Sequence, residues 1–301
     1  MIRKYSIKDL EHLTGIKAHT IRIWEQRYNI IEPSRTDTNI RYYVDSDLKR
    51  LLNISVLVNG GLRISKVAKM SSLEIQDAVL DKARYEGSYS TQVNGLKIAM
   101  LDFNEDLFET IFNQSMIKFG SDETFRSIIG SFIKEVGVLW QTNAISVAHE
   151  HFVSNIIRQK LFSAIDQIPS VSDKEAQRFL LYLPSQELHD LGLLYLHLIL
   201  KRRGFKVVNL GQSCPLEYLK EVHHKVKFDY LISIFTTNPY DDEMDDYLRN
   251  LVAEFPDKRT EFLFAGFQLR EYKWSGKDNR VHVFRSMDQL VRSLPVPAEA
   301  V

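Results

Sequence analysis

The stretch LPSQELHDLGLLYLHLILKRRGF, residues 183–205, decides how the last third of the chain folds. An apolar strand is expected to end at Leu183, and an apolar helix is expected to run up to Arg203, with Gly204 just after its end. Between them lies ELHDLG, residues 187–192, where a dinucleotide-binding turn would carry Gly-x-Gly-x-x-Gly. A phosphate is held mainly by backbone amides at such a turn, so a histidine there points to another ligand.

Five short apolar runs alternate with helical stretches from Arg178 onward, namely RFLLYLP, KVVNLG, DYLISIFTT, EFLFAG and VHVFRS. This alternation predicts a parallel sheet with helices on both faces and right-handed crossovers. Ligands of such sheets bind beyond the carboxyl ends of the strands. Those ends are expected to carry Glu187, His189 and Gly192, then Gln212 and Ser213, then Ser233, Thr236 and Thr237, and finally Ala265 and Gly266.

His189 has the chemistry of a metal ligand in this position. A neutral imidazole binds transition metals, and a carboxylate two residues away, Glu187, can hold the other ring nitrogen in the ligating tautomer. Small residues at Gly192, Ser233 and Ala265-Gly266 would leave a deep slot beside the ring. For the short motif alone, the competing interpretation is a solvated loop histidine.

In combination these residues resemble the cobalamin-binding domain, in which an Asp/Glu-x-His-x-x-Gly loop supplies the lower ligand of cobalt and a Ser-x-Leu strand and a Gly-Gly pair follow. Here Glu187-x-His189-x-x-Gly192 is complete, Ser233-Ile234-Phe235 replaces Ser-x-Leu, and Ala265-Gly266 replaces Gly-Gly. The resemblance implies a flavodoxin/Rossmann-like domain with His189 on the metal. The cofactor-binding residues expected in it are Glu187, His189, Asp190, Gly192, Ser233, Thr237, Ala265 and Gly266.

The first 70 residues form a basic segment with 13 Lys and Arg against 7 Asp and Glu, although the whole chain has zero formal charge. Ser6 is expected to cap a helix that Gly15 stops, and KAHTIRIWEQRY, residues 17–28, is expected to form a second helix with a polar and basic outer face. Two such helices have the geometry of a helix-turn-helix that enters a major groove. The stretch SRTDTNIRYY, residues 34–43, then reads as a small wing along the phosphates.

Residues 5–62 resemble the winged helix-turn-helix of MerR-family transcription regulators, including a third helix expected at residues 45–59. In that family the domain binds promoter DNA as a dimer. The residues that the resemblance assigns to DNA are His19, Thr20, Arg22, Arg27, Arg35, Asn39, Arg41 and Tyr42. Trp24 and Tyr43 are expected to belong to the core instead. No sustained heptad pattern follows Met70, so subunits must associate by means other than a long coiled coil.

Residues 76–172 show apolar residues at three- and four-residue steps, with polar breaks at 87–91, 120–122 and 142–144. This pattern predicts a bundle of about four helices. Trp140 would end one helix, and Ser146 would cap the next, which carries Glu150 and His151 in its first turns. From this segment alone, a ligand pocket lined by these side chains and a core Trp beside a solvated Glu-His pair both remain open.

The order of a winged helix in residues 1–75, a bundle in 76–172 and a cobalamin domain in 173–301 resembles the CarH/CarA/LitR group of B12-dependent MerR-type repressors. That resemblance implies that Trp140, Glu150 and His151 cap the upper face of adenosylcobalamin, or of methylcobalamin as the alternative corrinoid. It also implies a dark tetramer that represses a promoter and falls apart when light breaks the cobalt–carbon bond. Gln141 departs from the pattern, because in the group's best-known photoreceptor a histidine follows the tryptophan and takes the upper cobalt position after photolysis. Three alternatives stay open: His149 or His151 substitutes for it, the photoproduct keeps a water ligand, or this member senses B12 more than light.

Two other classes remain open: a regulator whose cobalamin fold is empty and binds protein, and a corrinoid methyl carrier, against which the winged helix argues. We expect no catalytic residues and no enzyme activity. No apolar run approaches the roughly 20 residues of a membrane span, and MIRKYSIKDL lacks the apolar core of a secretory signal. With Cys214 as the only cysteine, the composition predicts a soluble cytoplasmic protein without internal disulfides.

Overall fold

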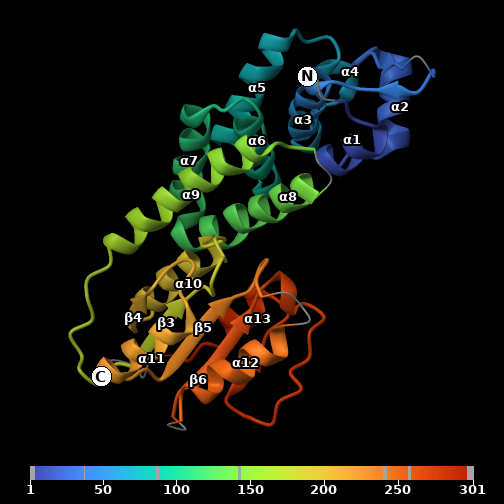
Figure 1. Cartoon of the computed structure of the whole chain (residues 1–301). Coiled ribbons are helices and arrows are strands. Elements are labelled where there is room, and N and C mark those ends of the chain that lie inside the picture. Colours follow the sequence, from blue (N-terminus) through green and yellow to red (C-terminus); the bar gives the residue numbers. More distant parts are fainter. Residues whose placement is uncertain are drawn as a thin grey trace. The chain divides into compact units, whose positions relative to one another are not determined.

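The chain folds into two compact units, residues 1–156 and 157–301, in the computed structural model (Figure 1). The structure describes residues 4–36, 38–85, 88–141, 144–239, 243–256 and 259–296. The first unit is helical apart from a two-stranded hairpin, and the second is built on a five-stranded sheet. The multidomain α and α/β architecture expected from the sequence is confirmed. No helix in these described ranges is long and apolar enough to span a membrane.

The N-terminal elements follow the expected winged helix-turn-helix closely. They are α1 (Ile7–Thr14), α2 (Ala18–Tyr28), the hairpin strands β1 (Ser34–Arg35) and β2 (Arg41–Tyr42), and α3 (Asp45–Asn59). The Ser6 side chain accepts a hydrogen bond from the Asp9 amide and so caps α1. Gly15 ends the helix at φ 71°, a left-handed conformation that glycine adopts without strain.

The helical segment that follows departs from the expected four-helix pattern at two places. Its elements are α4 (Ile64–Val67), α5 (Ser72–Tyr85), α6 (Tyr89–Leu101), α7 (Glu105–Glu123), the π-helix η1 (Thr124–Ile129), α8 (Gly130–Gln141) and α9 (Val147–Asp166). A break missed from the sequence separates α6 from α7, where the Asn104 side chain accepts from the Leu107 amide and caps α7. The expected loop at 120–122 is instead a kink at Gly120, which lies at φ 77° inside a continuing helical segment. The predicted break at 142–144 has its first two residues outside the described ranges.

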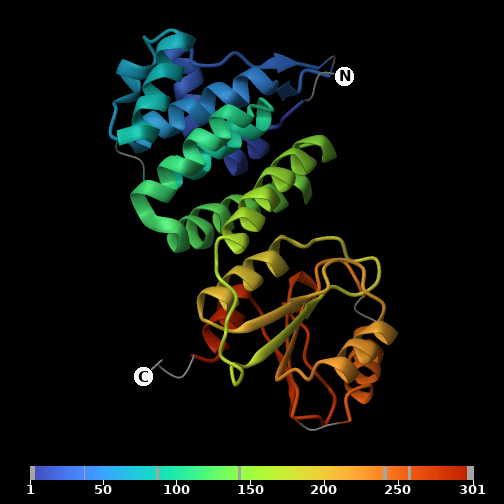
Figure 2. The same ribbon diagram turned by 90° about the vertical axis from the view of Figure 1, so that its left-hand side faces the viewer.

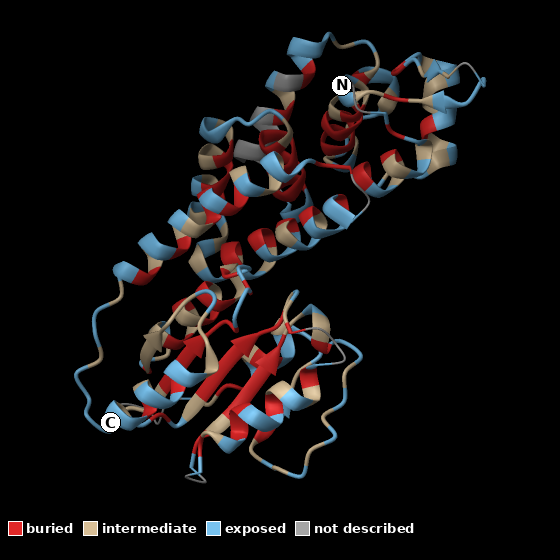
Figure 3. Cartoon of the chain, viewed as in Figure 1, coloured by how far each residue is buried: buried red, intermediate tan, exposed pale blue. Residues whose placement is uncertain are grey.

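The core of the first unit runs through α3 and α6 (Figure 3). Both helices are buried around most of their circumference, from Leu51 to Leu57 in α3 and from Thr91 to Met100 in α6. A helix buried on all sides lies in the middle of a domain rather than at its surface. The winged helix-turn-helix elements and the bundle therefore share one apolar core.

The second unit carries the parallel sheet that the five apolar runs predicted. Its strands are β3 (Arg178–Tyr182), β4 (Lys206–Asn209), β5 (Tyr230–Ile234), β6 (Glu261–Ala265) and β7 (Val281–Val283), in the spatial order β4-β3-β5-β6-β7. Its helices are α10 (Leu191–Arg202), α11 (Leu216–Lys225), α12 (Met244–Ala253) and α13 (Met287–Ser293), with the short η2 (Phe267–Leu269) after β6. This order is that of flavodoxin-like folds, whose ligand crevice opens at the ends of the first and third strands.

Helices cover both faces of this sheet (Figure 2). On one face α10 and α13 contribute Leu193, Leu196 and Leu290 to a core with strand residues such as Phe179. On the other, α11 and α12 contribute Leu219 and Leu248. Because both faces are covered, the centres of the strands are apolar, which is why their runs were readable in the sequence.

Candidate functional site

The outer face of α2 presents the polar side chains that the sequence assigned to DNA. His19, Arg22 and Arg27 are exposed, and Thr20 is partly exposed beside them. Ile21 is fully buried and fixes the helix to the core, so its neighbours point outward. A short helix anchored by its inner face, with a basic outer face, has the form that major-groove recognition needs.

The wing is the hairpin of β1 and β2, paired in antiparallel register with Arg35 opposite Arg41. The Arg35 Nη1 atom donates to the Asn39 side-chain oxygen at 2.7 Å, while Asn39 itself lies at φ 63° in the turn. Arg41 is exposed, with its Nε atom 3.8 Å from a Glu25 carboxylate oxygen. The Lys4 ammonium lies 4.4 Å from the centre of the Tyr42 ring. The hairpin thus gathers three basic side chains at its surface.

Tyr43 belongs to the core, as expected, and not to the DNA-facing set. It is fully buried, and its hydroxyl donates to Glu25 Oε2 at 3.0 Å. Burial, together with the Glu25 carboxylate, raises the pKa of Tyr43 to about 12. Glu25 therefore links the recognition helix to the wing through both Tyr43 and Arg41.

Trp140 and Glu150 lie at adjoining helix ends, as the sequence predicted. Trp140 is the penultimate residue of α8 and is 48% exposed, a large value for an indole. Glu150, in the first turn of α9, lies 2.6 Å from His151 Nδ1 and accepts from the Ser154 hydroxyl at 2.5 Å. An exposed indole can offer an apolar wall to a ligand, and a positioned carboxylate can offer a hydrogen-bond acceptor.

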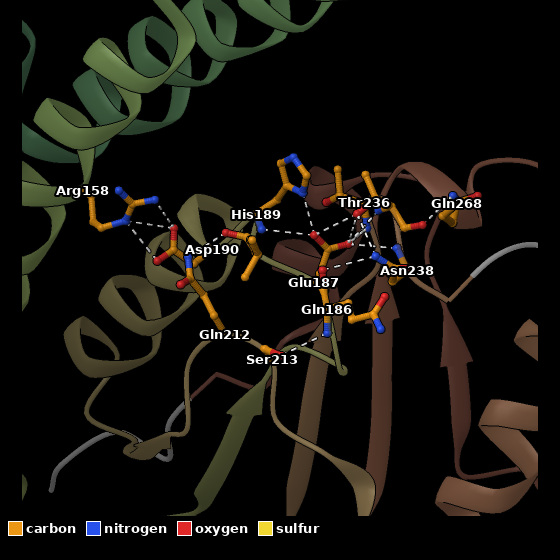
Figure 4. A network of polar contacts seen from close by, with 12 residues as sticks. Arg158, Gln186, Glu187, His189, Asp190, Gln212, Ser213, Thr236, Asn238 and Gln268 are labelled. Atoms are coloured by element: carbon orange, nitrogen blue, oxygen red, sulfur yellow. Dashed lines mark hydrogen bonds and ion pairs between the residues drawn. The ribbon is translucent and has the colours of Figure 1, made fainter. Parts of the chain in front are cut away.

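The second cluster lies at the carboxyl ends of β3 and β5, where Glu187 is its buried centre (Figure 4). Its Oε2 atom accepts from the backbone amides of Thr236 at 2.9 Å, Thr237 at 2.6 Å and Asn238 at 3.2 Å. Its Oε1 atom lies 2.6 Å from His189 Nδ1 and also accepts from the His189 amide. The loop after β3 is thus held to the loop after β5 by one carboxylate.

Glu187 is charged in this setting. Burial alone would raise the pKa of its carboxyl, but the hydrogen bonds from His189 and from the Thr237 and Asn238 amides outweigh it and lower the pKa to about 2. A carboxylate facing Nδ1 requires the proton on that nitrogen, which puts the imidazole lone pair on Nε2. Figure 4 shows the His189 ring standing away from the strand ends, and its side chain is 55% exposed. This arrangement is the one in which a metal-binding histidine is held by an outer carboxylate.

The small residues predicted to line a slot are all in or beside the sheet ends. The buried Ser233 hydroxyl donates to the Tyr182 carbonyl at 2.9 Å, so it serves the β3–β5 pair directly. A Cβ at Gly192 would lie 3.1 Å from the end of the Met287 side chain. At Gly266, φ is 136° and a Cβ would lie 2.1 Å from the Phe235 carbonyl oxygen, so only glycine fits between β6 and β5. Ala265 is buried beside it.

Sequence reasoning missed several residues that hold this cluster together. Arg158, on the part of α9 in the second unit, donates to both carboxylate oxygens of Asp190 at 2.9–3.1 Å. Gln212 Nε2 donates to the Leu188 carbonyl at 2.6 Å, and the Ser213 hydroxyl accepts from the Gln186 amide. The loops after β3 and β4 therefore meet, as their strand ends predicted. Asp190, which the sequence placed at the cofactor, faces an arginine that no local pattern indicated.

We expect Arg158→Met to destabilise the second unit by about 2 kcal/mol, because the nearly buried Asp190 would lose its bidentate partner. Urea unfolding measures the change. Gln159→Met, at the exposed neighbouring position, is the matched control and should change little. Equal unfolding midpoints for the two variants would show that the ion pair does not hold the His189 loop.

The residues present fit a cobalt corrinoid at its metal end. They offer an imidazole whose tautomer is set by a buried carboxylate. They also offer two exposed apolar side chains, Leu188 in the same loop and Phe267 directly after Gly266. Gly192 packs closely against Met287, whose unbranched side chain can change rotamer. A dinucleotide fits less well, because the loop between β3 and α10, residues 183–190, has no glycine, and the nearest one is Gly192 in the first turn of α10.

Two family models match this chain: the MerR HTH family regulatory protein over residues 5–74 and the B12 binding domain over residues 92–163. The chain is 25% identical to the HTH-type transcriptional repressor CarH of Myxococcus xanthus, covering 94% of this chain and 95% of that protein. It is also 25% identical to the repressor CarA of the same organism, covering 83% and 84%. The resemblance expected from the sequence is confirmed.

Among solved structures, the monomethylamine corrinoid protein of Methanosarcina barkeri matches with a TM-score of 0.47 and 15% identity, covering 72% of this chain and 97% of that chain.

A third relative by sequence, the transcriptional regulator MlrA of Escherichia coli, is 34% identical over 73 residues, which are 24% of this chain and 30% of that protein. The chain thus combines a MerR-type helix-turn-helix with a B12 binding domain.

Proposed function

We propose that this chain is a transcription regulator that grips promoter DNA with α2 and the wing and is controlled by a cobalamin held at the Glu187–His189 cluster. The two family matches support a DNA-binding and B12-binding regulator. The basic outer face of α2 and the three cations of the wing supply the charge that phosphate contacts need. We assign no catalytic step to any residue.

One observation carries the cofactor assignment. The His189 imidazole is held by a fully buried carboxylate in the tautomer that presents Nε2 to a metal, at the crevice end of a flavodoxin-like sheet. A loop histidine with only a surface role would not need such a carboxylate. Glu187 accepts hydrogen bonds from three backbone amides of the loop after β5 and is thereby fixed behind the imidazole.

The roles of the chain's own residues follow from this arrangement. His189 would hold cobalt through Nε2, and Glu187 would keep the proton on Nδ1 and so preserve the ligating tautomer. Trp140 offers an apolar wall, and Glu150, oriented by His151 and Ser154, offers an acceptor to the upper group. Bound adenosylcobalamin would supply a cobalt–carbon bond that visible light can break.

We further propose that the dark, cofactor-loaded chain forms a tetramer that represses its promoter and that illumination separates the subunits. Paired winged helices bind one palindrome with a high effective concentration, and a single domain loses that gain. Gln141 is a poorer cobalt ligand than histidine. His149, a candidate to replace that histidine, has contacts of its own. Its Nδ1 atom accepts from the Ser146 amide, and its ring stacks on Phe103 with 4.5 Å between the ring centres.

His189→Ala is expected to shift the visible spectrum of bound adenosylcobalamin and to weaken its binding by at least about tenfold, because the lower ligand is lost. Spectral titration in the dark measures both. His224→Ala, at an exposed position on α11, is the control and should match the wild type. An unchanged spectrum at saturating cofactor would mean that the ligand is misassigned. A colourless wild-type protein that still binds DNA would instead favour an empty cobalamin fold.

The oligomer change needs its own measurement. The mass of the loaded full-length chain is determined by light scattering in the dark and again after green illumination. A fall from tetramer mass supports the proposal, and an equal mass in both states contradicts it.

A further inference from the structure

The winged helix is packed into the bundle rather than tethered to it. Helix α3, the last helix of the DNA-binding elements, has a buried run from Leu51 to Leu57, and α6 has one from Thr91 to Met100. The Lys49 ammonium, on α3, is paired with the Asp102 carboxylate just after α6. A displacement of the bundle helices must therefore also displace the DNA-binding elements, because packed cores transmit strain.

Lys97 ties three helices of this unit at one buried point. Its side chain is 4% exposed in the middle of α6, yet its ammonium donates to the Leu13 carbonyl at 3.0 Å and lies 2.6 Å from Glu135 Oε2. Leu13 is in the last turn of α1, whose carbonyls have no partner within the helix, and Glu135 is on α8. A buried cation is tolerated only with such partners, so this contact fixes α1 against α8.

A second contact joins the wing side to the entry of α9. The Tyr5 hydroxyl lies 2.6 Å from Asp45 Oδ1 and 3.3 Å from the Ala144 carbonyl oxygen. The Tyr5 backbone also pairs with Tyr43 in both directions, at 2.8 and 2.9 Å, directly after the wing strand β2. Ala144 and Ile145 are buried, and the next residue, Ser146, contacts His149 in the first turn of α9.

Tyr5 therefore stands between the wing and the segment that leads to Glu150. We propose that Tyr5 is a positioning residue that transmits a shift of Ala144–Ser146 to the wing within one subunit, so that a ligand at the Trp140 and Glu150 side chains alters DNA affinity without a change of oligomeric state. The inference rests on the proposed function for the identity of that ligand. The mechanical link itself rests on the Tyr5, Ala144 and Lys97 contacts.

The test compares full-length wild type with Tyr5→Phe, which keeps the buried ring and removes the hydroxyl. The probe is a duplex selected from random sequence by the wild-type chain, and its Kd is measured in the dark with and without adenosylcobalamin, at protein concentrations where light scattering gives equal masses. The ratio of the two Kd values is expected to shrink by about two- to tenfold in Tyr5→Phe, the range of one hydrogen bond. A ratio equal to that of the wild type overturns the inference.

Asp45→Ala is the matched control, because it removes the other partner of the same hydroxyl and leaves Ala144. Its Kd ratio should stay at the wild-type value, and a loss equal to that of Tyr5→Phe would assign the effect to α3 and overturn the role of Ala144.

A readout without cofactor separates this inference from the proposed function. Coupling is reciprocal, so DNA binding must change amide hydrogen exchange in residues 144–150 of the cofactor-free wild type, by at least about twofold, and not in Tyr5→Phe. If DNA binding leaves the amide hydrogen exchange of residues 144–150 unchanged in the wild type, the link is overturned. A clear exchange response in a chain that binds no cobalamin would support the link and reject the proposed cofactor.

Discussion

Glu187→Gln is expected to destabilise the second unit by about 3 kcal/mol. The position is fully buried and surrounded by hydrogen-bond donors, and the amide NH₂ group of glutamine is a donor itself, so it cannot accept from them. The amides of Thr236, Thr237 and Asn238 would lose charge-assisted bonds, and His189 would lose the group that sets its tautomer. Urea unfolding of the full chain at neutral pH measures the loss.

The chain offers a matched surface pair as control. Glu261 lies 2.7 Å from His282 Nε2, but both side chains are more than a third exposed. Glu261→Gln should therefore change stability by less than about 1 kcal/mol, as exposed ion pairs do. Similar losses in the two variants would show that the buried network is not the stabilising feature.

The same carboxylate predicts a pH dependence. The pKa of Glu187 lies at about 2 in the folded chain against 4.5 ordinarily, so the unfolded chain binds the proton more readily as the pH falls. The stability that Glu187 contributes is fully present above about pH 4.5 and is lost as the pH falls toward 2. Wild type should become less stable across that window, and Glu187→Gln should show a shallower slope there.

The sheet was predictable from sequence because its strands are covered on both faces and read as short apolar runs with polar borders. The hairpin and α3 were predictable because Pro33, Asn39 and Asp45 mark turns and a helix start. The break before Asn104 was missed, because apolar residues continue on both sides of it. At 120–122 the polar residues predicted a loop, but the helix continues through a kink at Gly120.

The site was predictable only where its parts are close in sequence. Glu187 and His189 are two residues apart, so their contact follows from spacing. The amides after β5 reach Glu187 only because β5 lies beside β3 in space, a neighbour relation that the chain order does not contain. Arg158 was missed for the same reason, since its partner is 32 residues away on another element.

Removing Arg22 and Arg41 together is expected to weaken promoter binding by about 100-fold, because each exposed arginine supplies roughly 1–3 kcal/mol when it contacts a base or phosphate. The single variants should differ in kind. Arg22, on the outer face of α2, is placed to read a base edge, so Arg22→Ala should relax specificity at one step of the operator.

Arg41, in the wing, is placed for the phosphates, so Arg41→Ala should weaken all duplexes alike and lower the slope of log Kd against log salt by about 1 per subunit. Gel shifts at several salt concentrations separate the two effects. Arg126→Ala, which removes a positive charge from η1 in the bundle, controls for net charge and should leave both affinity and slope unchanged. Loss of affinity equal to that of Arg41→Ala in this control would mean that long-range charge, rather than contact by the wing, governs binding. The difference between the slopes is decisive because a contacting arginine releases a counterion from DNA, and a distant one, beyond the Debye length of about 8 Å, does not.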